Sequence, residues 1–253
     1  MASQVKENPL KERIAKYLAR LGIASRRQVE AMIPSGRITV NGEPVVHPAT
    51  FVNHDDNIAV DGAAVGAKES ARLWLYNKPK NVMVSERDPE GRKTIYDTFP
   101  AAMPRVIPVG RLDYATEGLL LLTNSGGLKR HLELPATGWQ RRYRTRVQGE
   151  WKDDIANTLA KGIKVDGEAF GPILAEVEPN QRYNPRQLWL EVSLREGKNR
   201  EVRRAMSHVG LEVTKLIRVS YGPFQLGELE EGRLREVSEK VLREQIGNIL
   251  EYL

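Results

Sequence analysis

The fold of this chain is decided by the stretch Gly110-Arg111-Leu112-Asp113-Tyr114-Ala115-Thr116-Glu117-Gly118-Leu119-Leu120-Leu121-Leu122-Thr123-Asn124. Its run of four leucines predicts a short buried element, so the segment just before the run stands on a rigid support. Two glycines bracket that segment and favour a bend or a close approach of the backbone. Asp113 is therefore placed either for chemistry or for local capping of the turn, and the spacing alone leaves both interpretations open.

Composition bounds the class of protein. The 253 residues suffice for one large domain or two modest ones, and 40% of them are hydrophobic, which is enough for a core. The formal net charge of +6 indicates a polyanionic partner. No apolar run approaches bilayer length and no signal peptide opens the chain, so we expect a cytoplasmic protein that is not attached to a membrane.

The sequence predicts chemistry that uses no bound metal ion or organic cofactor. There is no cysteine, and the four histidines lack the spacing of metal ligands. No phosphate-binding loop or dinucleotide fingerprint is present. We therefore expect no metal and no organic cofactor. The chain also shows no coiled-coil pattern or apolar seam, which favours a monomer.

A small basic module is predicted at the start of the chain. Residues 10–21 place apolar side chains on one helical face. Ser25 with Gln28 matches the capping box of a second helix. Residues 37–40 alternate like a strand, and Asn41-Gly42 is a strong hairpin signal. Seven basic residues and two glutamates lie between positions 11 and 37, which suits a phosphate-binding surface or an ordinary solvated face.

This module resembles the S4-like RNA-binding domain, a resemblance carried by Arg20-Leu21-Gly22-Ile23-Ala24-Ser25-Arg26-Arg27 and Gly36-Arg37-Ile38-Thr39-Val40-Asn41-Gly42. In that domain the second helix and the loop after it bind structured RNA. The resemblance implies RNA contacts by Arg26, Arg27 and Arg37. We expect this domain over residues 8–61, a small and polar linker over 62–71, and a second domain over 72–253.

The stretch around Asp113 resembles the active-site signature of pseudouridine synthases, in the branch that acts on bacterial ribosomal RNA. Tyr76-Asn77-Lys78-Pro79 is a second similarity, and in that family it opens the catalytic domain. The resemblance implies that Asp113 is the catalytic residue. The residues that it implies for the substrate pocket are Arg111, Leu112 and Leu216.

Residues 140–147, Gln-Arg-Arg-Tyr-Arg-Thr-Arg-Val, predict a strand with one cationic face. Arg142 and Arg144 on this face are candidates for phosphate contact. Tyr143 matches the second motif of the family, in which the tyrosine stacks on the target base and is proposed to help proton transfer. A plain core position is the alternative role for Tyr143.

The segment Glu196-Gly197-Lys198-Asn199-Arg200-Glu201-Val202-Arg203-Arg204 resembles the third motif of the family, whose arginine lies beside the catalytic aspartate. Arg203 is the best positional match and Arg204 is the fallback. Such a guanidinium would hold Asp113 charged and oriented. The RNA-contact candidates of this segment are Lys198, Arg200 and Arg204.

Strands outnumber helices in the predicted pattern, and they do not alternate strictly with helices. This favours an α+β fold, in which a small helix–helix–hairpin RNA-binding domain precedes a larger catalytic domain with a mixed or antiparallel sheet. Within the larger domain we expect strands at 73–76 and 82–85 and a terminal helix over 238–253.

The resemblance implies isomerisation of a uridine in ribosomal RNA to pseudouridine, with large-subunit RNA favoured over small-subunit RNA. The target is flipped out of the RNA, and Asp113 acts as nucleophile or base at the sugar or at the ring. The substrate is free RNA or an assembly intermediate. Two alternatives are a non-catalytic RNA chaperone and a glycoside hydrolase with Asp113 and Glu117 as its carboxylate pair, although the four Trp and four Phe suit a sugar site poorly.

Overall fold

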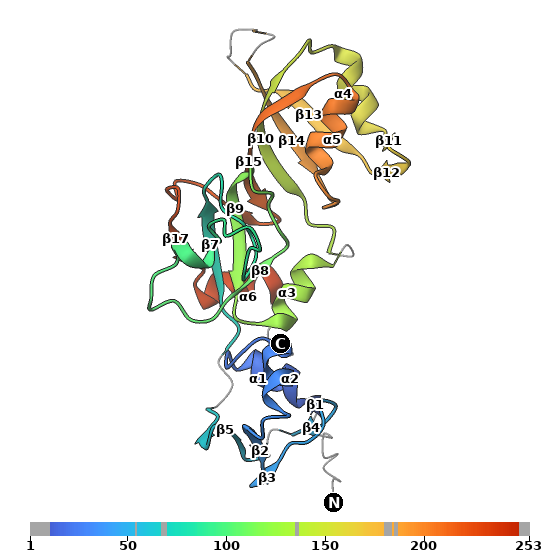
Figure 1. Ribbon diagram of the computed structural model, residues 1–253. Helices are drawn as coiled ribbons and strands as arrows, with labels where there is room; N and C mark the ends of the chain where they lie inside the picture. Colours follow the sequence, from blue (N-terminus) through green and yellow to red (C-terminus); the bar gives the residue numbers. More distant parts are fainter. Residues whose placement is uncertain are drawn as a thin grey trace, which may run out of the picture. The chain divides into compact units, whose positions relative to one another are not determined.

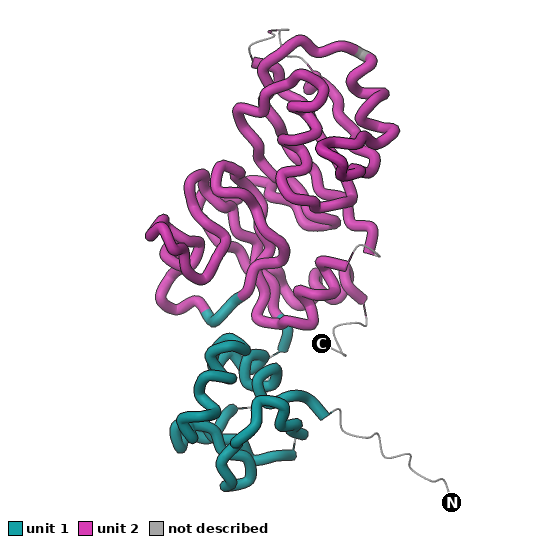
Figure 2. Tube along the Cα trace, turned by 45° about the vertical axis from the view of Figure 1, so that its right-hand side comes forward, with its two compact units in different colours: residues 1–71, 104–106 teal, residues 72–103, 107–253 magenta. Residues whose placement is uncertain are grey.

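The computed structural model describes residues 11–53, 55–66, 70–134, 137–179, 184 and 187–247. The chain forms two compact units, one of residues 1–71 with 104–106 and one of residues 72–103 with 107–253 (Figure 2). Parts of the expected domain boundaries, at 8–10, 67–69 and 248–253, lie outside the described residues.

The first unit packs two short helices on small sheets around one core. Ile14, Leu18, Val29 and Ile38 are buried at its centre. Its four-stranded sheet has the order β3-β2-β5-β6, and β1 pairs separately with β4. The elements are β1 (Glu12–Arg13), α1 (Ile14–Arg20), α2 (Arg26–Met32), β2 (Ile38–Val40), β3 (Glu43–Pro44), β4 (Phe51–Val52), β5 (Ile58–Val60) and β6 (Ala63–Ala64).

The capping box and the hairpin turn predicted for this unit are both confirmed. The Ser25 hydroxyl accepts from the Gln28 amide at 3.3 Å, and the Gln28 side chain accepts from the Ser25 amide at 2.8 Å, which completes the capping box. Asn41 and Gly42 have φ of 54° and 88°, as a two-residue hairpin turn between β2 and β3 requires.

The helix predicted over 10–21 is wrong at its start. Glu12–Arg13 forms β1 and pairs antiparallel with Phe51–Val52, and the Ile14 amide donates to the Thr50 carbonyl at 2.8 Å. Residue 10 lies outside the described residues. The apolar pattern suited a helix there, but pairing with a distant strand draws the first turn into extended backbone.

The segment expected as a linker, 62–71, begins with structure instead. Asp61 and Gly62, with φ of 53° and 79°, make a second tight turn. Ala63–Ala64 then pairs with β5, and the Val65 amide donates to the Ile58 carbonyl at 2.9 Å. The small residues indicated a flexible linker, but the turn brings them back to pair with strand β5.

The second unit is built on one nine-stranded sheet (Figure 1). The order is β13-β14-β10-β15-β9-β7-β17, with β16 paired to β15 and β8 to β9. All pairs are antiparallel except β15 with β9, so the predicted α+β class with a mixed sheet is confirmed. The elements are β7 (Leu73–Lys78), the 3-10 helix η1 (Tyr96–Thr98), β8 (Ile107–Val109), β9 (Glu117–Thr123), α3 (Gly126–Glu133), β10 (Arg141–Gln148), α4 (Asp153–Ala160), β11 (Ile163–Val165), β12 (Glu168–Phe170), β13 (Ile173–Val177), β14 (Leu188–Leu194), α5 (Glu201–His208), β15 (Glu212–Tyr221), β16 (Phe224–Gln225), β17 (Leu234–Glu236) and α6 (Glu239–Ile246).

Two packing features position the site in this unit. Helices α4 and α5 cover the same face of β10, β13 and β14, through buried residues such as Leu159 and Met206 (Figure 1). The four leucines predicted to be buried form the centre of β9 and are fully buried. At the parallel junction, Gly118 of β9 lies against Arg218 of β15. A side chain at Gly118 would fall 2.8 Å from the Arg218 nitrogen and closer still to its carbonyl oxygen, so this junction requires glycine.

Two further expectations are corrected or limited. The strand predicted over 82–85 is wrong, because only Met83 makes an isolated bridge, with Thr94. Asn81 has φ of 60°, so the chain turns directly before the segment. The terminal helix is present as α6, whereas 248–253 lie outside the described residues. None of the described helices has the length and apolar character needed to cross a membrane.

Candidate active site

A cavity of about 750 Å³ lies in the second unit, bordered by residues of β10, β14 and β15, the turn before β9 and the loop before α5. Seven residues predicted from the sequence line it together: Arg111, Leu112, Asp113, Tyr143, Lys198, Arg200 and Leu216. The structure thus gathers side chains that are up to about a hundred positions apart in the chain. Of the other candidates, Arg142, Arg144, Arg203 and Arg204 are not part of the cavity lining.

Asp113 opens a tight turn that leads into β9. The Thr116 amide donates to the Asp113 carbonyl at 3.0 Å, which closes the turn. The Asp113 side chain is 31% exposed, so solvent or a ligand in the cavity can reach its carboxylate. At the entry to the turn, the Gly110 amide donates to the Glu133 carboxylate of α3 at 2.6 Å. The backbone around Asp113 is therefore held from a neighbouring helix as well as from the sheet.

Three cationic side chains bind carbonyl oxygens of the same turn and the start of β9. Lys78 Nζ donates to the Thr116 oxygen at 2.9 Å, and Arg203 Nη2 donates to the Ala115 oxygen at 3.1 Å. Arg218 Nε donates to the Leu119 oxygen at 2.7 Å. These bonds fix the backbone and place positive charge behind Asp113 without occupying its carboxylate.

The residue that pairs with the Asp113 carboxylate is Arg200, at 3.6 Å. Arg203, which the sequence predicted beside Asp113, instead binds two carbonyl oxygens, those of Ala115 and Val213. Burial lowers the pKa of Arg203, and the nearby charge of Arg200 lowers it further, whereas Asp113 raises it. Arg200 takes the left-handed conformation, with φ of 49°, directly before α5. This backbone conformation is uncommon for a residue other than glycine, and sequence spacing does not reveal it.

Lys78 is fully buried at the end of β7. Burial lowers the pKa of Lys78 to about 8, and the carboxylates of Glu117 and Asp113 oppose that shift. Its Nζ also donates to the Pro79 oxygen at 2.9 Å. The sequence analysis used Lys78 only as part of a motif. A lysine that follows the apolar run Leu-Trp-Leu-Tyr was the available signal for a buried charge.

The wall of the cavity comes from neighbouring strands. Tyr143 of β10 lies opposite Arg218 of β15, and Thr145 lies opposite Leu216. Residues two positions apart in a strand share a face, so Leu216 and Arg218 point to the same side as Tyr143. Leu216 is buried, and Tyr143 is partly buried against the core. An aromatic ring and an aliphatic side chain thus lie side by side on one face of the sheet, in the lining of the cavity.

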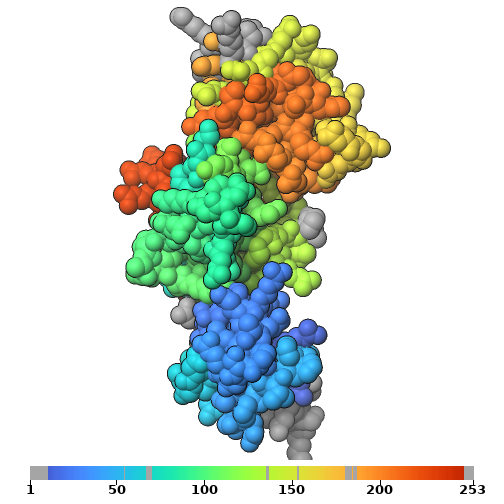
Figure 3. Space-filling model, in the orientation of Figure 1, coloured from blue at the N-terminus to red at the C-terminus, as the bar shows by residue number. Residues whose placement is uncertain are grey.

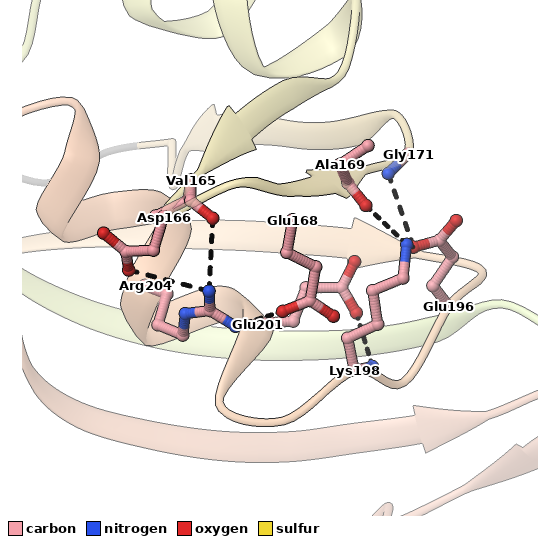
Figure 4. Close-up of polar contacts among 9 residues, drawn as sticks. All are labelled: Val165, Asp166, Glu168, Ala169, Gly171, Glu196, Lys198, Glu201 and Arg204. Atoms are coloured by element: carbon pink, nitrogen blue, oxygen red, sulfur yellow. Dashed lines mark hydrogen bonds and ion pairs between the residues drawn. The ribbon is translucent and has the colours of Figure 1, made fainter.

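The predicted RNA contacts near α5 are engaged with carboxylates. Arg204 binds Glu168 at 2.6 Å and lies 3.6 Å from Asp166, both in the β11–β12 hairpin (Figure 4). Lys198 pairs with Glu196 at 2.5 Å and donates to the Ala169 oxygen. The hairpin lies on the surface beside α5 (Figure 3). Phosphate would have to compete with these acids for both cations.

Other predicted RNA contacts differ in how far they are already paired. Arg37 binds Asp61 at 2.6 Å, and Arg144 binds Glu178 at 2.6 Å. Arg142 donates to the Gln225 side chain at 2.8 Å. Arg26 and Arg27 lie in the first turn of α2, and both are exposed. Arg200 also borders a second cavity of about 350 Å³, whose other lining residues are Val165, Asp166, Arg203, Arg204, Ser207 and His208.

No group of three or more His, Asp or Glu side chains suited to a metal ion occurs within the part of the chain that the structure describes. The chemistry available at the cavity is that of a partly exposed carboxylate on a rigid turn, with guanidinium groups and an aromatic ring around it. Such a set suits nucleophilic or proton-transfer chemistry on a planar, polar ligand.

Comparison with known proteins identifies the family. Residues 72–208 match the model of RNA pseudouridylate synthases, and residues 12–58 match the S4 domain. A protein of Rickettsia prowazekii, named an uncharacterized RNA pseudouridine synthase, is 39% identical over 92% of this chain and 97% of its own length. The ribosomal large subunit pseudouridine synthase B of Bacillus subtilis is 35% identical over 90% of this chain and 92% of its own. A crystal structure of a pseudouridylate synthase superposes with a TM-score of 0.64 at 25% identity, covering 92% of this chain and 99% of the other. The chain therefore belongs to the RNA pseudouridine synthase family and carries an S4 domain ahead of the synthase domain.

Proposed function

We propose that this protein isomerises a uridine of large-subunit ribosomal RNA to pseudouridine, with Asp113 as the catalytic carboxylate. The observation that carries the proposal is the partly exposed Asp113 on a turn held by several backbone bonds, facing a cavity lined by Tyr143 and Leu216. The name of the Bacillus subtilis relative supports the choice of large-subunit RNA.

In this reaction the bond between N1 of uracil and C1′ of ribose breaks, the base turns, and C5 bonds to C1′. The proton on C5 leaves and N1 gains a proton, so the product is an isomer of the substrate. The target uridine must leave the RNA stack to enter the cavity. Tyr143 then stacks on the base, and Leu216 supplies apolar wall beside it.

Asp113 acts at the sugar or at the ring, and Arg200 forms an ion pair with its carboxylate at 3.6 Å. Arg203 is a positioning residue that acts through the Ala115 carbonyl. A turn that is already held in place lowers the reaction barrier, because it does not need to rearrange when the base enters the cavity. Arg111 and Leu112 complete the substrate pocket.

RNA is held by two sets of cations. We assign residues 8–61 to RNA binding, through Arg26, Arg27 and Arg37, and residues 72–253 to catalysis. In the catalytic domain the proposed phosphate contacts are Arg142, Arg144, Lys198, Arg200 and Arg204. Because Arg37, Arg144, Lys198 and Arg204 already have acidic partners, we expect Arg26 and Arg27 to contribute more per residue to RNA affinity.

The glycoside hydrolase alternative loses support. Glu117 pairs with Lys215 at 3.1 Å and is not among the residues that line the cavity. It also lies in the strand β9, so the four-residue spacing does not bring it beside Asp113 as it would in a helix. A pair of carboxylates flanking one bond is therefore not formed by these two residues.

The test is tritium release from large-subunit ribosomal RNA labelled at C5 of uridine, with wild type, Asp113→Asn and the control Asp154→Asn. Asp154 is exposed on α4, away from the cavity. We expect release by wild type and control and none by Asp113→Asn, while all three bind the RNA. No release from RNA of either subunit, naked or in particles, would favour a chaperone that binds without turnover.

A further inference from the structure

Arg218 occupies a central position in the cavity that the sequence did not single out. It lies on β15 opposite Tyr143 of β10 and beside Gly118 of β9. Its side chain lines the cavity, although the residue is only 3% exposed. Arg218 thus stands between the tyrosine proposed to stack on the base and the strand that begins directly after the Asp113 turn.

The guanidinium of Arg218 is incompletely satisfied. Its Nε donates to the Leu119 oxygen at 2.7 Å, but its Nη2 is buried without a hydrogen-bond partner. The Tyr221 ring lies 5.2 Å from the guanidinium carbon. Among the ion pairs of the described residues, none joins a carboxylate to Arg218. This contrasts with Arg144 and Arg204, which are more exposed and bind acids.

A buried cation without an anion is costly, so a ligand that supplies an acceptor or negative charge to Arg218 would be bound favourably there. The guanidinium carbon of Arg141 also lies 4.7 Å from the centre of the Tyr221 ring, and Arg141 lines the same cavity. The end of the cavity formed by Arg141, Tyr221 and Arg218 therefore favours a planar group that carries negative charge during the reaction.

We propose that Arg218 is a catalytic residue that binds a carbonyl oxygen of the flipped uracil and stabilises the negative charge that develops on the base. The inference rests on the proposed function. When the N1–C1′ bond breaks, its electron pair stays on N1 and spreads to O2 and O4. If Asp113 instead adds to C6 of the ring, the displaced electron pair spreads over C5 and O4. Both routes place charge on a carbonyl oxygen, and a guanidinium donor lowers the barrier in either.

The charge is transient, so no proton or electron is consumed by Arg218. After the base turns, C5 forms its bond to C1′. In the sugar route this bond displaces the Asp113 carboxylate from C1′, and the C5 proton then leaves; in the ring route the bond between Asp113 and C6 breaks as the C5 proton leaves. N1 gains a proton in both routes. Arg218 keeps its own protons throughout, as expected of a guanidinium. Its contribution should therefore appear in the rate of the chemical step and not in RNA affinity.

The test compares wild type, Arg218→Gln, Arg218→Lys and the control Arg146→Gln under single-turnover conditions, with nucleosides separated by chromatography. Arg146 lies on the same sheet, donates to Thr214 and does not line the cavity. We expect Arg218→Gln to slow product formation about 10²-fold, the cost typical of removing one oxyanion donor. The RNA dissociation constant should change less than about threefold, and Arg218→Lys should keep part of the rate because its charge remains.

A second substrate separates charge stabilisation from a structural role. In a transcript with 5-fluorouridine, fluorine withdraws electrons and itself stabilises the negative ring, so Arg218→Gln should slow consumption of the fluorinated nucleoside by about tenfold or less. An equal loss on both substrates, or a loss confined to affinity, would overturn the role of Arg218. If Arg218→Gln does not fold, the same comparison is made with Arg218→Lys. If wild type is active and the Arg218 variants react at the same rate, the catalytic role of Arg218 is refuted but the proposed function stands. If wild type is inactive on uridine RNA, both the proposed function and the role of Arg218 are refuted.

Discussion

Replacing Lys78 with methionine removes a buried charge behind the Asp113 turn and keeps a side chain of similar length. Lys78 is fully buried, and its Nζ donates to the Pro79 and Thr116 oxygens at 2.9 Å each. Burial lowers its pKa from 10.5 to about 8, despite the nearby carboxylates of Glu117 and Asp113. The charged form is thus disfavoured in the folded protein relative to the unfolded chain.

The magnitude follows from that difference in pKa. Lowering the pKa of Lys78 from 10.5 to about 8 reduces the free energy of unfolding at pH 7 by about 3 kcal/mol. Methionine removes this cost but leaves two carbonyl oxygens without a donor, at about 1–3 kcal/mol each. The two effects are of similar size, so the change in unfolding free energy at pH 7 is a poor test.

The pH dependence is a sharper test. Because the folded-state pKa of Lys78 is depressed, the unfolded chain binds more protons between about pH 8 and 10.5, and stability rises with pH in that window. Between pH 7 and 9 this contribution amounts to about 1 kcal/mol. Lys78→Met should lack it, whereas other titrating groups contribute equally to both proteins and cancel in the comparison.

The assay is urea unfolding of wild type and Lys78→Met at pH 7, 8 and 9, with Lys152→Met as the matched control. The Lys152 side chain is 61% exposed, so its removal should leave the pH profile unchanged. We expect wild type to gain about 1 kcal/mol relative to Lys78→Met over this range. Parallel profiles for the two proteins would refute a buried, charge-disfavoured lysine at this position.

Three further outcomes follow from the structure. Gly118→Ala should lower the unfolding free energy by about 2–4 kcal/mol, because φ is +97° and a Cβ would collide with the Arg218 backbone. The measurement is thermal melting, and the control is Gly126→Ala, which has open space around its Cβ position. Ser25→Ala should cost about 1 kcal/mol through loss of the capping box, and an unchanged melting temperature would contradict the bond. Exchange of Arg26 and Arg27 for serine should reduce the slope of RNA affinity against salt by about two in filter binding, and an unaltered slope would exclude phosphate contact.

Short-range signals were sufficient where the bonds that form an element join neighbours in the chain. The capping box links Ser25 to Gln28, and the Asn41-Gly42 turn joins two adjacent strands. The run of four leucines identified the central strand β9 because only a fully buried element can hold it. These elements could be predicted because propensity and packing agree there.

Sequence reasoning was weakest where a partner comes from far along the chain. The start of the first helix became a strand because Phe51–Val52 pairs with it. Arg37, Arg144 and Arg204 were interpreted as free phosphate contacts, yet their acidic partners lie 24, 34 and 36 residues away. Charge patterns along a sequence count cations but do not show which of them a fold neutralises.

The candidate site divides in the same way. The sequence alone determined that a carboxylate at Asp113 precedes a buried strand, and motif resemblance added Tyr143 and Leu216, which the structure brings to one cavity. Only the tertiary structure decided what holds the turn and the start of β9: Lys78, Arg203 and Arg218 bind carbonyl oxygens there from 38, 88 and 99 residues away. A backbone carbonyl is the same acceptor in every residue, so no sequence pattern marks which cation will reach it, and that choice is made by the packing of β7, β15 and α5 around β9.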